Sequence, residues 1–260
     1  MRTVHRIVLA CCLTATCTGL ASAQEPAAPA TPAPPSADTT SSDNWSWVVE
    51  PYFLVPTMSG TSGIHGLTSD VNASSGDILG ALDFGAMLYL EVNNPKWAFS
   101  LDGTYMDLGA SGDTKLGSVD VDLKQSGVMA AGYRRFEPWA EVMFGLQFNA
   151  IKGSLTSSGP LGVHRSDNQG WVDPYLGVRL TAPRADKWLF AFTGAVGGFG
   201  IASDFAWQAF PQIGYRFNPL FELTGGFRAI AMDYENGSGS GAFVYNMITY
   251  GPQVGAKFHF

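Results

Sequence analysis

Residues 83–93 read DFGAMLYLEVN, a stretch in which large apolar side chains recur at every second position. Phe84, Leu88 and Leu90 fall on one side of an extended chain, whereas Tyr89 and Glu91 fall on the other. Side chains of a β-strand alternate between the two faces of a sheet, so this stretch predicts a strand with one apolar and one polar face.

The same alternation recurs from residue 45 to the end of the chain. Predicted strands begin near residues 45, 83, 96, 118, 139, 170, 187, 205, 219 and 242. Short turns are expected at 93–96, 136–138, 183–187 and 218–219. Longer loops rich in Gly, Ser and Asp are expected at about 57–82, 109–117, 153–169 and 235–241.

Short turns opposite long loops are typical of a transmembrane β-barrel. We therefore predict an all-β fold, a single antiparallel barrel of about ten strands with short periplasmic turns and longer extracellular loops. Ser74 and Asp77 begin the stretch SSGDILGAL and predict a short helix inside the first long loop. A distorted strand there would raise the strand count to about twelve, and a run that does not span would lower it to about eight.

The composition fits a barrel that faces lipid. Charged residues make up 14% of the chain and aromatic residues 13%, whereas an ordinary soluble domain carries roughly 25% charged residues. Mean hydropathy is only +0.06, and beyond the first two dozen residues no apolar run reaches the roughly 18 residues that a membrane-spanning helix needs. A helical membrane protein is therefore excluded.

The first residues are typical of a secretory signal peptide. Basic Arg2 and Arg6 precede an apolar stretch, and small residues lead to a predicted cleavage between Ala23 and Gln24. All three cysteines lie before this point, which leaves the mature chain without disulfides or a thiol nucleophile. We divide the chain into a signal peptide (1–23), a disordered Pro/Ala-rich periplasmic linker (24–44) and the barrel (45–260).

A soluble barrel would turn its apolar face inward, and a membrane barrel does the reverse. The apolar face carries tryptophans at predicted strand starts, as an interfacial aromatic girdle requires: Trp45, Trp97, Trp139, Trp171 and Trp188. Around residues 129–133, Met129, Ala131 and Tyr133 are assigned to this outer face and Arg134 to the inner one.

The polar face predicts a narrow lumen with a network of charges. Its predicted members are Glu50, Glu91, Asp102, Arg134, Glu141, Asp173, Arg179, Arg216, Glu222 and Arg228. Paired and hydrogen-bonded, such groups would fill the barrel, and a ring of about ten strands is closer to a filled barrel than to a wide channel. A narrow wet conduit is the alternative interpretation.

The last strand carries the strongest motif. Tyr250, Val254, Phe258 and Phe260 alternate on one face up to the end of the chain. This pattern resembles the sorting signal read by the barrel-assembly machinery, and the chain resembles the small Gram-negative outer-membrane β-barrel proteins. The opening WSWVVEPYFLVPTMSGT and the stretch SGDILGALDFGAML look like an uncharacterised set of such barrels. The resemblance implies the outer membrane, contact with its lipid and lipopolysaccharide, and assembly through the C-terminal strand.

No constellation in the sequence indicates catalysis, a metal or a cofactor. The histidines lack metal-ligand spacing, and a net charge of −7 without a basic patch excludes nucleic acid as a partner. The leading hypothesis is a non-enzymatic barrel with a structural role, or one in binding or passing small solutes. The alternative is a lipid- or peptide-modifying hydrolase that uses His164, Ser166 and Asp167.

Overall fold

The computed structural model describes residues 44–64, 67–114, 117–157, 162, 164–182 and 187–260. The predicted signal peptide, its cleavage site at Ala23 and Gln24, and the predicted linker up to residue 43 lie outside the described residues. Among the residues that are described, no helix is both long and apolar enough to cross a membrane.

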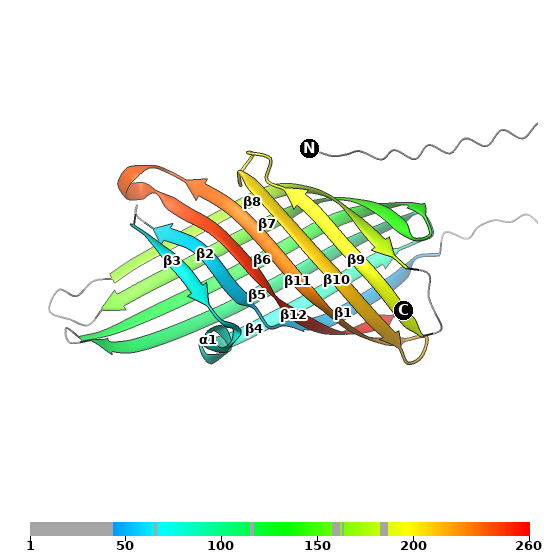
Figure 1. The fold of residues 1–260 in the computed structure, drawn as a ribbon, viewed down its shortest axis with the longest axis horizontal. Coiled ribbons are helices and arrows are strands. Elements are labelled where there is room, and N and C mark those ends of the chain that lie inside the picture. The colour runs from blue at the N-terminus through cyan, green and yellow to red at the C-terminus, as the bar shows by residue number, and fades with distance from the viewer. Residues whose placement is uncertain (1–43, 65–66, 115–116, 158–161, 163, 183–186) are drawn as a thin grey trace, which may run out of the picture. The chain divides into compact units, whose positions relative to one another are not determined.

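The described part of the chain folds into one twelve-stranded antiparallel sheet with one short helix and one 3-10 turn (Figure 1). The elements are β1 (Ser46–Leu54), β2 (Thr57–Ile64), β3 (Leu67–Ala73), α1 (Ser75–Gly80), β4 (Leu82–Asn93), β5 (Trp97–Thr114), β6 (Gly117–Glu137), β7 (Ala140–Ser157), β8 (His164–Thr181), β9 (Trp188–Gly197), β10 (Phe205–Arg216), β11 (Phe221–Asn236), η1 (Gly239–Gly241) and β12 (Phe243–His259).

Ten of these strands close a ring, as predicted. The order is β1, then β4 to β12 in sequence, and β12 pairs back with β1. The first and last strands are joined near the chain end by two hydrogen bonds, from Trp47 N to Phe260 O (3.0 Å) and from Phe260 N to Trp47 O (2.8 Å). Both ends of the barrel segment therefore lie at the end that carries the short turns, which we call the short-turn end.

The opposite end, the far end, is less regular. β12 pairs with β1 over Gln253–His259 and with β2 over Val244–Tyr250, and β2 forms a hairpin with β3. The β1–β4 ladder stops at Pro51 and Leu88, because proline has no N–H to donate to a continuing ladder. In the described residues the ring is thus complete only toward the short-turn end.

The predicted helix is confirmed as α1. Ser74 caps it, its hydroxyl accepting a hydrogen bond from Asp77 N, and the Asp77 carboxylate accepts one from Ser74 N in return. The hydrogen bonds from Ser74 hold the pKa of Asp77 below its ordinary value. The β2–β3 hairpin was not predicted, because Gly- and Ser-rich sequence carries no apolar alternation.

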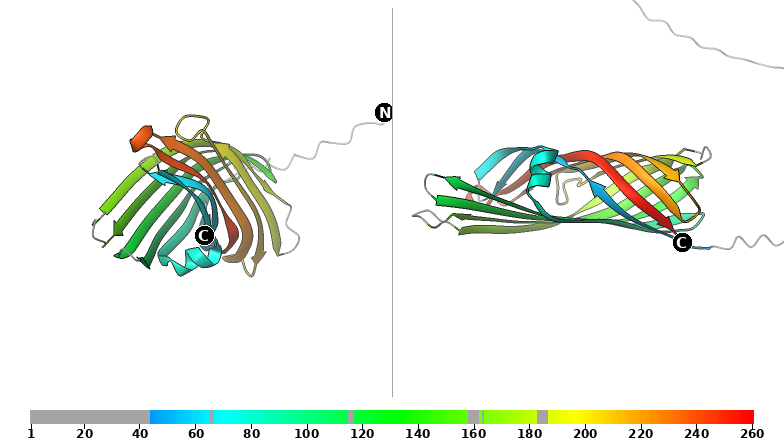
Figure 2. Two further views of the ribbon diagram at one scale, coloured as in Figure 1. Left: turned by 60° about the vertical axis from the view of Figure 1, so that its left-hand side comes forward. Right: turned by 90° about the horizontal axis from the view of Figure 1, so that it is seen from below.

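Two other predicted loops are also largely strand. β5 continues to Thr114 and β6 begins at Gly117, so both extend into the predicted loop at 109–117. β7 and β8 together cover most of the predicted loop at 153–169. Figure 2 shows these long strands continuing past the ring at the far end. Each supplies ladder partners to its neighbour, so pairing outweighs the weak strand preference of Gly and Ser.

The outer face is apolar, and this inverts the arrangement of a soluble protein. Along β7, Phe144 and Phe148 are exposed while Glu141 is buried. Further along the same strand the faces exchange character, because Lys152 is exposed and Ile151 is buried. The apolar outer surface is therefore a belt around the barrel, and the strands emerge from it toward the far end.

The predicted faces of β6 are wrong. Met129, Ala131 and Tyr133 are buried inside, whereas Val128 and Phe136 are exposed on the outside. Met, Ala and Tyr suit either side of a narrow barrel, so hydrophobicity alone does not assign this strand. The pairing register with β5 and β7 does so.

Trp171 is also misplaced in the predicted girdle. β8 begins at His164 rather than near residue 170, which puts Trp171 in mid-strand on the inward face, 6% exposed. Its ring stacks on Tyr234 at a centroid distance of 4.2 Å. Trp45, Trp139 and Trp188 do lie exposed at strand ends.

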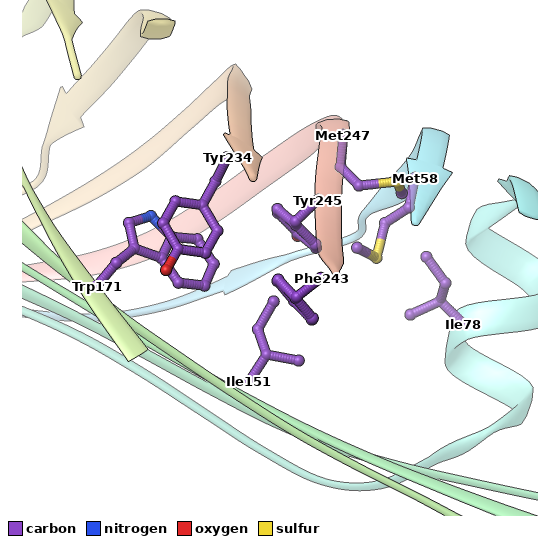
Figure 3. Close-up of a cluster of buried hydrophobic side chains, with 8 residues drawn as sticks. All are labelled: Met58, Ile78, Ile151, Trp171, Tyr234, Phe243, Tyr245 and Met247. Carbon is purple, nitrogen blue, oxygen red and sulfur yellow. The ribbon is translucent and has the colours of Figure 1, made fainter. Parts of the chain in front are cut away.

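Trp171 belongs to an apolar cluster inside the far end. Its buried members, drawn in Figure 3, come from β2, α1, β7, β8, β11 and β12 and are Met58, Ile78, Ile151, Trp171, Tyr234, Phe243, Tyr245 and Met247. Ile78 reaches the cluster from α1, so the helix closes this core from the side where β1 and β4 separate.

A tryptophan pair tests these placements. Trp171→Ala should lower the free energy of unfolding in detergent by about 3–5 kcal/mol, because it opens a cavity in a packed core. Trp139→Ala, which removes a 52% exposed ring, should lower it much less. Chemical denaturation monitored by circular dichroism makes the comparison. Equal losses in the two variants would contradict the inward position of Trp171.

Candidate functional site

The lumen toward the short-turn end is a polar cavity of about 370 Å³. Its charged lining residues come from strands all round the ring. They are Glu50, Glu91, Asp102, Arg135, Glu141, Arg179, Arg216, Glu222, Arg228, Lys257 and His259.

Five carboxylates in this cavity face five cationic side chains. The closest atom pairs are Lys257 Nζ to Glu50 Oε2 (3.3 Å), Arg179 Nη1 to Glu91 Oε2 (2.5 Å), Arg228 Nη2 to Asp102 Oδ2 (2.7 Å), Arg135 Nη2 to Glu141 Oε1 (2.6 Å) and Arg216 Nη2 to Glu222 Oε2 (3.1 Å). Arg179 also donates from Nε to Glu141. Each of these five carboxylates is thus matched by a cationic side chain.

Two of these pairs cross the lumen. Arg179 on β8 reaches Glu91 on β4, and Arg228 on β11 reaches Asp102 on β5. In the ring order, β8 and β4 stand on nearly opposite walls, as do β11 and β5. The two guanidinium groups therefore extend across the lumen.

Aromatic side chains support both crossings. Tyr52 donates from its hydroxyl to Asp102 (2.5 Å) and accepts from Arg228 (3.2 Å). The Arg179 guanidinium lies 4.0 Å from the ring centroid of Tyr133, a residue that faces inward only because β6 has the register described above. Buried charges are tolerated when paired and hydrogen-bonded in this way.

The structure brings most of the predicted network residues together in the lumen. Arg134 and Asp173 are the exceptions. Arg134 lies on the outer face, with its guanidinium 4.8 Å from the Trp97 ring centroid. Arg135 occupies the inward position instead. Lys257 and His259 also line the lumen and were not among the predicted network residues, although both alternate with outward Phe258 along β12.

Asp173 is inside but outside the ion-pair network. It is 0% exposed and accepts hydrogen bonds from Trp171 Nε1 (3.0 Å), Ser203 N (2.8 Å) and Ser203 Oγ (2.6 Å). Within the described residues it makes no ion pair. Its role is to anchor the segment between β9 and β10 to the wall of the barrel.

The residues of the hydrolase hypothesis do not converge. They lie at the start of β8, where alternation puts His164 and Ser166 on one face and Asp167 on the other. His164 Nδ1 is 3.0 Å from Thr156 Oγ1, while Asp167 accepts from Asn168 N (2.7 Å). Among the described residues, no group of three or more His, Cys, Asp or Glu is placed to hold a metal.

The fold and the two faces define the class of protein. A closed antiparallel barrel with an apolar outer belt and a charged interior is stable only with lipid outside. Barrels of this type with an even number of strands are those of the Gram-negative outer membrane. The chain is an outer-membrane β-barrel protein.

Comparisons with known proteins found distant similarity to solved structures. No protein-family model and no curated protein matches the sequence. Among solved structures, the outer-membrane protease OmpT of Escherichia coli is 12% identical over 84% of this chain and 98% of its own, with a TM-score of 0.47. Ail of Yersinia pestis is 12% identical over 83% and 98%, with a TM-score of 0.36. Neisserial surface protein A is 10% identical over 83% and 97%, with a TM-score of 0.32.

Removing one crossing arginine tests the network. Arg179→Ala leaves Glu91 and Glu141 buried without this cation, and should lower the free energy of unfolding by about 3–5 kcal/mol. The matched control is Arg134→Ala on the outer face, which loses a cation–π contact worth about 0.5–1 kcal/mol. Urea unfolding in detergent compares them. A fully stable Arg179→Ala barrel would show that water, not protein, surrounds this site.

Proposed function

We propose that this protein is a non-enzymatic outer-membrane barrel that is closed to ions at rest and binds a small polar solute in its lumen. The observation that carries the proposal is the double crossing of the lumen by Arg179 and Arg228. Passage would require both guanidinium groups to leave their carboxylates, so binding is favoured over free diffusion.

The size and lining of the cavity support solute binding. Its volume of about 370 Å³ falls in the range of roughly 300–1,000 Å³ found for small-molecule sites. Gln253 lines the cavity, and among the described residues its buried Oε1 has no hydrogen-bond partner. A buried acceptor of this kind favours a ligand that donates a hydrogen bond.

The hydrolase alternative has less support. Nucleophilic catalysis needs the nucleophile, the base and the acid in hydrogen-bonding reach of one another. Ser166 and Asp167 are neighbours on one strand and point to opposite faces. Convergence of His164, Ser166 and Asp167 would therefore require β8 to leave the sheet.

Conductance in planar bilayers tests the closed lumen. The refolded protein should show no steady ohmic conductance, because the crossing ion pairs occupy the cross-section. The double variant Arg179→Ala/Arg228→Ala should open a conductance if it still shows heat-modified gel mobility, the sign of a closed barrel. A steady, ion-selective current through the unaltered protein would contradict the proposal.

We further propose that the barrel-assembly machinery recognises the last strand, and that lipid and lipopolysaccharide surround the belt. The observation that supports the first part is the outward row of Tyr250, Val254 and Phe258 beside exposed Phe260.

Deleting Phe260 should lower the amount of folded barrel in the outer membrane and leave protein in the periplasm or degraded. Phe136→Ala, which removes an exposed aromatic ring from the short-turn end of β6, is the control and should assemble normally. Cell fractionation with heat-modified mobility measures both. Normal assembly of the deletion variant would show that Phe260 is not part of the signal.

A further inference from the structure

The outer wall of the barrel contains a second cavity, an open groove on the face turned away from the lumen. It has a volume of about 880 Å³ and lies on the apolar face of the belt. It is lined by outward residues of β1 and of β4 to β8, among them Ala130, Phe144 and Leu176, with Phe199 and Ile201 at one end. The polar residues Glu91 and Ser100 also line it.

The groove follows one row of cross-strand neighbours. Trp47 pairs with Val92, and the row continues through Phe99, Gly132 and Phe144 to Leu176. Six strands at about 4.8 Å spacing give the row a length of about 24 Å.

The row also climbs through the membrane. Trp47 follows the first residue of β1, whereas Leu176 lies well inside β8, which ends at Thr181. A strand tilt of about 40° turns the length of the row into a rise of about 15 Å, half of a hydrocarbon core about 30 Å thick. The groove thus spans about one leaflet, beginning at the short-turn end.

The floor of the groove is made of small residues. A Cβ atom on Gly132 would lie 2.6 Å from Cζ of Phe144, so this position has no room for a side chain while the ring keeps its place. Ala130 is the neighbouring outward residue on β6. The Phe144 ring therefore lies over the Gly132 backbone, and both residues line the groove together with Ala130.

The segment between β9 and β10, residues 198–204, lies beside the β8 end of the groove, and we call it the hook. Gly198, Phe199 and Gly200 all have positive φ angles, 83°, 54° and 69°. Phe199 is the one non-glycine residue with such a φ among those described, and this conformation is costly for an aromatic residue. It leaves Phe199 half exposed and Ile201 72% exposed beside the groove.

The hook is held rigidly from inside. Asp173 accepts both the backbone N–H and the hydroxyl of Ser203, and Ala202 packs against the interior apolar cluster. The Asp173 carboxylate and the positive-φ backbone of residues 198–200 thus hold the Phe199 and Ile201 side chains on the outer surface. Neither side chain belongs to the buried apolar core.

We propose that this groove holds one acyl chain of a phospholipid from the leaflet at the short-turn end, with Phe199 and Ile201 capping the end of the chain. The groove is continuous with the lipid-facing belt, its lining is apolar apart from Glu91 and Ser100, and its rise matches one leaflet. Glu91 and Ser100 line both the groove and the lumen cavity, but the acyl chain would lie on the outer wall and the solute inside the barrel, so neither proposal rests on the other.

Retention of a foreign lipid tests the site. The full chain is refolded into vesicles of palmitoyl-oleoyl phosphatidylcholine, extracted in dodecyl maltoside and examined by native mass spectrometry. The unaltered protein should keep one lipid per barrel. Ala130→Phe, which fills the groove, should reduce retention about tenfold or more, the change expected when about two methylene groups lose their burial.

Ala229→Phe is the matched control, because Ala229 faces outward on β11 beside Phe227 and does not line the groove. It should keep the lipid. If Ala130→Phe lacks heat-modified mobility, Ile201→Ser replaces it, since this exposed side chain supports no core contact and its loss should also reduce retention.

Three results would overturn the proposal. The first is no retained lipid on the unaltered barrel, and the second is equal retention in the Ala130→Phe and Ala229→Phe variants. The third is a dimer that Ala130→Phe dissociates, which would assign the groove to a second copy of the chain.

Discussion

The need to pair buried charges across a narrow ring determines how the inside of this barrel is arranged. Arg179 and Arg228 each cross the lumen to a carboxylate on a nearly opposite wall. An unpaired charge at either position would cost several kcal/mol. The inward faces of β4, β5, β8 and β11 must therefore be in register with one another, and the outward faces carry the apolar belt as a consequence.

The interior changes character along the barrel axis together with the exterior. Where the outside is apolar, the inside is charged; where β7 turns Lys152 outward, Ile151 and Trp171 are buried inside. The part in the belt is thus inverted relative to a soluble protein, and the far end is built like the core of one. α1 supplies Ile78 to that core at the place where β1 and β4 have separated.

Alternation was sufficient to predict the ring, because each strand in the belt has an apolar outer face that sequence can reveal. It failed for β6, where Met129 packs inside the barrel and Tyr133 lies under the Arg179 guanidinium. The sequence does not reveal such partners, since they come from strands distant in the chain. The β2–β3 hairpin was missed for a related reason: β2 pairs with β12 and β3 pairs with β2, and neither strand shows a sustained apolar alternation in its sequence. The outer groove could not be predicted from the sequence, because it is formed by neighbouring residues on six different strands and by the positive-φ segment at residues 198–200.

The arginines and carboxylates of the lumen are coupled across it rather than solvated separately. A double-mutant cycle on Arg228 and Asp102, with Arg228→Met and Asp102→Leu measured singly and together by urea unfolding in detergent, tests this directly. The account predicts that the double variant is more stable than the sum of the single losses implies, by about 0.5–3 kcal/mol. Strictly additive losses would contradict it and would indicate a wet lumen in which the two groups do not interact.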